Sequence, residues 1–143
     1  MLDFCHNDPS PEGVRLCAMI HLIYASGLRV SELVSLKLIE ITSGYKSMEV
    51  RSTFLVKGKG GKERMVVISD KARRAIADYL QIRDHFCKSK SQLAKTYFFT
   101  SNSSQGHMTR QNFATLLKQV ALKSGLDPDI ISPHVLRHSF ASH

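Results

Sequence analysis

The stretch MEVRSTFLVKGKGGKERMVVI, residues 48–68, decides the fold of this chain. Residues 48–56 and 64–68 are rich in β-branched and other apolar side chains, which favour extended strands. The segment KGKGGK at 57–62 separates them, and its glycines can adopt the positive φ that a tight turn needs. The sequence therefore predicts an antiparallel β-hairpin with a basic, glycine-rich tip.

Helices are predicted on both sides of this hairpin. Apolar residues recur at helical spacing, and Ser, Thr, Pro or Gly stands where each helix is expected to begin or end. A short apolar run at 97–99 is either a third strand or an extended core segment. The predicted helices run from Pro11 to Ser26, Val30 to Leu36, Asp70 to Phe86, Thr109 to Gly125, and from Pro133 onward. The predicted fold is a mostly helical α+β domain, with a small antiparallel sheet inserted after the second helix.

Composition places the chain among basic globular proteins. Its 143 residues, 20 Lys+Arg against 12 Asp+Glu, give a net charge of +8 and fit one domain at most. This surplus favours a polyanionic partner such as nucleic acid. No apolar stretch is long enough to span a membrane, and the first residues do not resemble a signal peptide. The 3 cysteines are widely spaced, as expected for reduced thiols in a cytoplasmic protein.

Several side chains could carry chemistry, each with a plainer alternative. His134 and Arg137 share one face of the last predicted helix, where they could bind a phosphate or simply face solvent. Arg29 stands at a helix start, against the helix dipole, and so pairs either with Glu32 or with an anionic ligand. Lys59 in the hairpin tip is either solvated or delivered to a phosphate on DNA.

Two other interpretations of these segments are weaker. His134 and His138 have the spacing of a zinc helix, but the glutamate that should follow the first histidine is missing. The segment GKGGK at 58–62 lacks the spacing of a nucleotide-binding phosphate loop, and it joins two strands rather than a strand and a helix. The sequence therefore favours neither a metal site nor a nucleotide site.

Taken together and in order, these segments resemble the catalytic domain of the tyrosine recombinase (phage integrase) family. The resemblance is strongest to its Xer-type members, and to the XerD-like branch in particular. Three motifs carry it: YASGLRVSEL at 24–33, GKGGKER at 58–64 and SPHVLRHSFASH at 132–143. The segment HMTRQNF at 107–113 also resembles the part of the family that opens the helix before the last motif. The resemblance covers nearly the whole chain.

The resemblance implies DNA strand cleavage and rejoining through a 3′-phosphotyrosyl link, without metal or cofactor. Arg29 and Arg137 are then expected to hold the non-bridging oxygens of the scissile phosphate. His134 is expected to assist proton transfer, and Lys59 to protonate the leaving 5′-oxygen. Glu32 is expected to orient the first arginine motif rather than to react. The partners implied are double-stranded DNA and other recombinase protomers, and four further side chains are expected to bind DNA: Lys57, Lys62, Arg64 and Arg110.

The chain also departs from the family pattern. The family's second histidine or tryptophan and its nucleophilic tyrosine follow the HxxR motif, and this sequence stops at His143 within that motif's helix. We likewise expect residues 1–143 not to include the family's separate N-terminal DNA-binding domain. We therefore expect residues 1–143 to form a partial catalytic domain that is inactive alone. The alternatives are a DNA- or partner-binding module and a metal-dependent phosphodiesterase that uses His134, His138 and His143.

Overall fold

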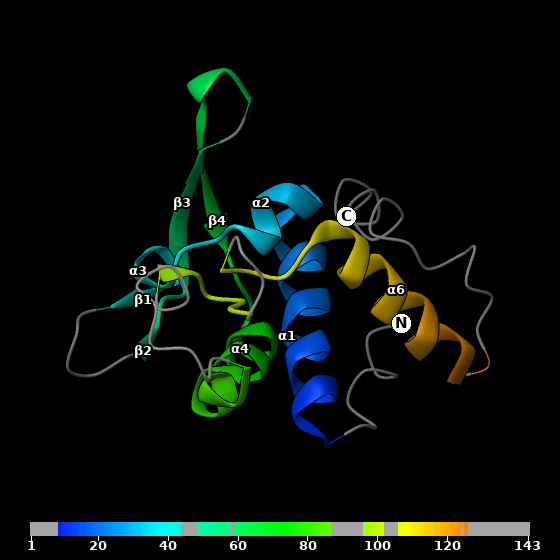
Figure 1. Cartoon of the computed structure of the whole chain (residues 1–143). Helices are drawn as coiled ribbons and strands as arrows, with labels where there is room; N and C mark the ends of the chain where they lie inside the picture. The colour runs from blue at the N-terminus through cyan, green and yellow to red at the C-terminus, as the bar shows by residue number, and fades with distance from the viewer. Residues whose placement is uncertain are drawn as a thin grey trace.

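A computed structural model of the chain describes residues 9–43, 49–57, 59–86, 96–101, 106–123 and 125. Helices dominate, as the sequence predicts, and Figure 1 shows two small strand pairs to one side of them. The longer helices are α1 (Pro11–Ser26), α4 (Asp70–Ile82) and α6 (Arg110–Lys123). The shorter elements are α2 (Val30–Val34), α3 (Leu38–Ile41), β1 (Thr42–Ser43), β2 (Glu49–Val50), β3 (Thr53–Lys57), β4 (Glu63–Val67) and the 3₁₀ turns η2 (Lys59–Gly61) and η3 (Arg83–Phe86).

Helix α1 begins and ends where the sequence predicts. The Ser10 hydroxyl accepts a hydrogen bond from the Gly13 N–H at 3.1 Å, and Pro11 supplies the first helical residue. Gly27 closes the helix in the left-handed conformation (φ 65°), with its N–H bonded to the Ile23 carbonyl at 3.0 Å. Both ends are fixed locally, so the loop that follows α1 has a defined starting direction.

The predicted single strand over 48–56 is wrong: its described part forms two strands with different partners. β2 pairs antiparallel with β1, whereas β3 pairs antiparallel with β4. The break lies at residues 51–52, where the Arg51 N–H bonds to the Ile41 carbonyl at 2.8 Å and the Ser52 carbonyl accepts from the Ile68 N–H at 2.9 Å. The segment therefore forms two strands rather than one, because β2 pairs with β1 and β3 pairs with β4.

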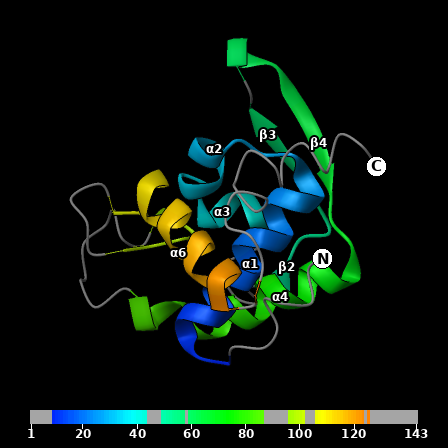
Figure 2. The ribbon, with the colours of Figure 1, turned by 90° about the vertical axis from the view of Figure 1, so that its right-hand side faces the viewer.

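The predicted hairpin is confirmed as β3–β4. Its register sets Val56 opposite Arg64 and Lys57 opposite Glu63, just before the tip. Gly60 (φ 78°) and Gly61 (φ 75°) turn the chain there in a conformation that L side chains rarely adopt. The hairpin projects from the body in both Figure 1 and Figure 2, with the η2 turn at its tip. Any group on the tip is therefore held away from the core on a regular support.

The core lies around α1, which packs between α4 and α6 (Figures 1 and 2). From α4, the side chains of Ala72, Ala75, Ile76 and Tyr79 are buried, and that of Leu80 is partly buried. Residues 97–99 form a core segment rather than a third strand: Tyr97 makes an isolated bridge with Lys37, and the chain bends at Phe98 and Phe99, which are fully buried. This segment is held through its carbonyl groups, since the Phe98 carbonyl accepts from the Tyr79 hydroxyl at 2.8 Å and from Arg83 Nε at 3.1 Å. Within the described residues, no helix is long and apolar enough to cross a membrane.

Helix α6 also matches its prediction. The Thr109 hydroxyl accepts from the Asn112 N–H at 3.1 Å, so Thr109 caps the helix. Phe113 and Leu117 are fully buried against the core, and Gly125 follows the helix with a φ of 72°. Because α6 contacts both α1 and α2, its N-terminal end is placed beside α2. The short helix α2 ends at Val34, before the predicted Leu36, and α3 is not predicted by the sequence.

Candidate functional site

Arg29 is held by its main chain while its side chain faces solvent. It stands just before α2 with extended backbone angles, and its N–H donates to Glu32 Oε1 at 2.8 Å. The side chain is exposed, and its guanidinium makes no ion pair with any residue that the structure describes. Of the two roles predicted for Arg29, the ion pair with Glu32 is therefore replaced by a main-chain hydrogen bond. With respect to the described part of the chain, the positive charge of Arg29 is therefore available to an anion.

Glu32 finds its cationic partner on the hairpin instead. Arg64 Nη2 lies 3.9 Å from Glu32 Oε1 and also donates to the Gly27 carbonyl at 3.2 Å. The Glu32 side chain is 16% exposed and that of Arg64 is 41% exposed. Arg64, predicted to bind DNA, is thus engaged with the α1–α2 joint, and the predicted orienting role of Glu32 gains a direct geometric basis.

The hairpin tip carries the remaining lysines of the predicted site. Lys59 begins the η2 turn, Lys57 ends β3, and Lys62 is exposed on the way into β4. For Lys57 and Lys59 the structure describes the backbone alone. The backbone of these lysines thus lies at or near the end of a hairpin that projects from the body (Figure 1).

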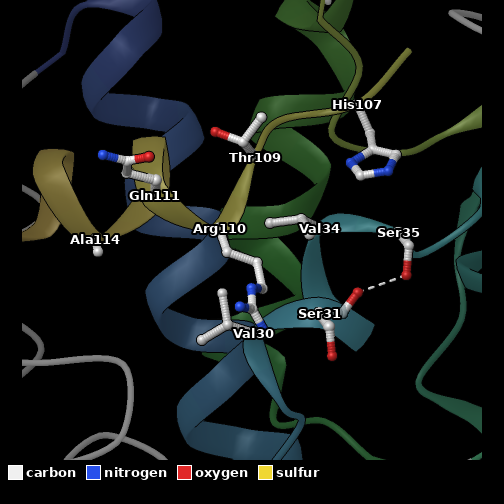
Figure 3. Close-up of a pocket in the computed structure, with 9 residues that line it drawn as sticks. All are labelled: Val30, Ser31, Val34, Ser35, His107, Thr109, Arg110, Gln111 and Ala114. Carbon is white, nitrogen blue, oxygen red and sulfur yellow. Dashed lines mark hydrogen bonds between the residues drawn. The ribbon is translucent and has the colours of Figure 1, made fainter. Parts of the chain in front are cut away.

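A cleft of about 800 Å³ opens between α2 and the start of α6. Its walls mix hydroxyl, amide, imidazole and guanidinium groups with a few apolar side chains. The lining residues are Val30, Ser31, Val34, Ser35, His107, Thr109, Arg110, Gln111 and Ala114. Figure 3 shows Arg110 extending from α6 toward Val30 and Ser31 on α2. Arg29 itself is not among the lining residues, although it immediately precedes Val30 in the sequence.

Most of the residues that line this cleft are not predictable from the sequence. Arg110 is predicted as a DNA-binding residue, and the structure places it in the wall. Ser31, Ser35 and Gln111 carry no local signal, because only the packing of α6 beside α2 makes them face one space. His107 is oriented by its own surroundings: its Nδ1 lies 2.7 Å from the Met108 carbonyl, and its ring meets the Tyr97 ring edge-on at 4.7 Å.

Comparison with known proteins identifies the family of this chain. The model of the phage integrase family matches residues 1–143. The chain belongs to the phage integrase family. It is 57% identical over 143 residues to the tyrosine recombinase XerD of Rickettsia bellii, covering 100% of this chain and 47% of that protein. It is 42% identical over 134 residues to the tyrosine recombinase XerD of Caulobacter vibrioides, covering 94% of this chain and 42% of that protein.

Solved structures of the family share the fold. The crystal structure of the XerA recombinase superimposes with a TM-score of 0.71 at 23% identity, covering 99% of this chain and 44% of that one. The XerH site-specific recombinase, bound to its difH substrate in a pre-cleavage complex, gives a TM-score of 0.70 at 23% identity, covering 99% of this chain and 38% of that one. This phage integrase chain thus spans less than half the length of the relatives it matches.

The family's last motif lies outside the described residues. His134 and Arg137, predicted to complete the phosphate site, fall there, as do His138 and His143 of the metal alternative. Among the described residues no group of three or more His, Cys, Asp or Glu side chains could hold a metal ion. The structure therefore relates Arg29 to the Lys59 hairpin through Arg64, and the convergence of all four predicted catalytic residues stays a prediction.

Not all of the chain's positive charge is available to a ligand. Arg15, near the start of α1, is 8% exposed and its guanidinium carbon lies 3.9 Å from the centre of the Phe86 ring. Burial lowers the pKa of this guanidinium, against smaller raising effects of Tyr79 and Glu12. Arg83 is likewise buried against carbonyl groups. These two arginines serve packing, whereas Arg29 and Arg110 are exposed.

Proposed function

We propose that these 143 residues belong to a site-specific DNA recombinase that cleaves and rejoins strands through a 3′-phosphotyrosyl intermediate. The observation that supports the proposal best is that Arg29 has a fixed main chain and an exposed guanidinium. Its main chain is fixed by Glu32, Glu32 is engaged by Arg64, and the guanidinium is exposed. Membership of the phage integrase family and the names of the XerD relatives support the same activity.

The proposed chemistry follows from the residue types. Arg29 and Arg137 hold the non-bridging oxygens of the scissile phosphate, where planar guanidinium groups match the charge of the transition state. The phenolic oxygen of a tyrosine bonds to phosphorus as the bond to the 5′-oxygen breaks. The phenolic proton passes to the His134 imidazole, and Lys59 delivers a proton to the leaving 5′-oxygen. One phosphodiester replaces another, so the step needs no oxidant and no energy source.

We infer that the nucleophile is not among the 4 tyrosines of this chain, which are Tyr24, Tyr45, Tyr79 and Tyr97. None of them follows Arg137, as the family's nucleophile does. Tyr79 is fully buried with its hydroxyl bonded to the Phe98 carbonyl at 2.8 Å, so it cannot reach a phosphate. The proposed role of residues 1–143 by themselves is therefore to bind the phosphate, as a partial catalytic domain.

A nicked suicide duplex tests this division of labour. With these 143 residues alone, we expect no covalent protein–DNA adduct on a denaturing gel. A second phage-integrase-family protein is then added, which has the nucleophilic tyrosine but carries alanine at the position equivalent to Arg29. Cleavage by the mixture would show that the 143 residues supply the missing phosphate site. An adduct formed by the 143 residues alone would contradict the assignment of the nucleophile.

The proposed partner is double-stranded DNA, followed by other recombinase protomers. Lys57, Lys62 and Arg110 are proposed to contact the DNA backbone, since Lys62 and Arg110 are exposed and Lys57 flanks the tip. A cytoplasmic location is part of the same proposal, because a chromosomal DNA substrate is found there. The alternative for residues 1–143 is a non-catalytic DNA-binding module, in which the same exposed cations bind the DNA backbone.

A further inference from the structure

Arg64 joins two parts of the proposed site that are far apart in the sequence. It lies on β4 opposite Val56, one residue pair before the end of the hairpin that carries Lys59. Its guanidinium donates to the Gly27 carbonyl at 3.2 Å, across 37 residues of chain. Because Gly27 ends α1 and Arg29 precedes α2, this bond attaches the hairpin to the loop that presents Arg29.

Glu32 makes a second link between the same parts. Its carboxylate accepts from the Arg29 N–H at 2.8 Å and has Arg64 Nη2 at 3.9 Å from the same oxygen, Oε1. With its side chain only 16% exposed, this carboxylate relies on Arg64 more than a fully solvated one would. Removing the Arg64 charge leaves the carboxylate uncompensated, so Glu32 is expected to turn outward and release the Arg29 main chain.

We propose that Arg64 is a positioning residue, which fixes the Arg29 loop and the Lys59 hairpin relative to each other through Gly27 and Glu32. This replaces the direct DNA contact predicted for Arg64 from the sequence. The consequence for DNA binding rests on the proposed function, whereas the consequence for the Arg29 main chain does not. Arg64 therefore acts on the phosphate through Arg29 rather than by touching it.

Amide hydrogen exchange tests the structural half without any DNA. In Arg64→Gln, exchange at the Arg29 N–H is expected to accelerate, while amides in the middle of α1 keep their protection. Arg73→Gln is the matched control, because Arg73 Nη2 lies 3.9 Å from Asp70 Oδ1 in an exposed pair on α4. If Arg64→Gln also exposes the α1 amides, Arg64→Lys is used instead, with a smaller acceleration expected at Arg29. Unchanged exchange at Arg29 in a folded Arg64 variant would overturn the proposal.

A double-mutant cycle on duplex binding tests the functional half. Affinity for a fluorescein-labelled random-sequence duplex is measured for the unmodified chain, Arg64→Gln, Arg29→Ala and the double variant. Arg64→Gln is expected to weaken binding by roughly tenfold alone and to have little further effect when Arg29 is already alanine. Equal losses in both backgrounds would show a direct phosphate contact and overturn the proposal. If the unmodified chain binds no duplex, the proposed function fails, while the exchange result still judges the positioning role.

Discussion

At the scale of single residues, the main chain and the side chain of Arg29 have different roles. Its main chain is bonded to Glu32, and its side chain is exposed. Sequence alone left an ion pair with Glu32 as an equal possibility, because a glutamate three residues later in a helix start can bond either the main chain or the side chain. The choice is decided by Arg64, whose position next to Glu32 depends on the tertiary fold.

This separation gives a prediction for Arg29→Ala. The variant keeps the N–H that bonds Glu32, so the free energy of unfolding should change by no more than about 0.5 kcal/mol. Duplex affinity should fall, and the slope of log K against log salt should become shallower by about 0.9, as expected for one lost phosphate contact. Urea unfolding and fluorescence anisotropy measure the two quantities. Duplex binding as tight as that of the unmodified chain would remove Arg29 from the DNA site.

At the scale of elements, the alternation of buried and exposed side chains along the hairpin indicates which face of each strand meets the core, but not which strands pair. Phe54, Val56 and Val66 face the core, and Leu55 and Met65 on the opposite face are about half exposed or more. Glycines at the tip and apolar runs on either side made the hairpin predictable. The split of residues 48–56 was not predictable, because β2 and β3 differ only in which distant strand each meets.

The register predicts different costs for two adjacent substitutions in β4. Val66→Ala should lower the free energy of unfolding by about 2 kcal/mol, because it removes two buried methyl groups and leaves a small cavity. Met65→Ala is the matched control, since Met65 is 59% exposed and should change stability by less than about 0.5 kcal/mol. Urea midpoints for the two variants provide the comparison. Equal losses would mean that the strand does not present alternate residues to the core.

In the helices, too, some features are set by neighbouring residues in the sequence and others by tertiary packing. The ends of α1 and α6 follow from capping residues within one turn, Ser10 and Gly27 for the first and Thr109 for the second. The cleft between α2 and α6 has no such local cause. Ser35 and Gln111 line it together only because the two helices pack side by side, and hydroxyl or amide groups on separate helices carry no signal of that meeting.

At the scale of the whole molecule, the basic side chains behind the net charge of +8 fall into two groups, some buried in the fold and others exposed to solvent. Arg15 and Arg83 are buried, and Arg64 ties two elements together. Arg29, Lys62 and Arg110 are exposed, with Arg110 in the wall of the cleft and Lys62 near the projecting tip. Composition predicted a polyanionic partner but could not say which cations meet it, because burial of a charged side chain is set by tertiary packing.

The central claim is that the exposed basic side chains of this chain bind a DNA backbone. The most direct test of it is the dependence of duplex affinity on salt. Binding of the unmodified 143-residue chain to a fluorescein-labelled random-sequence duplex is followed by anisotropy at increasing salt concentration. We predict that log K falls linearly with log salt, by about 0.9 for each phosphate neutralised, because bound counterions are released. An affinity that does not change with salt, or no binding at low salt, would contradict the claim.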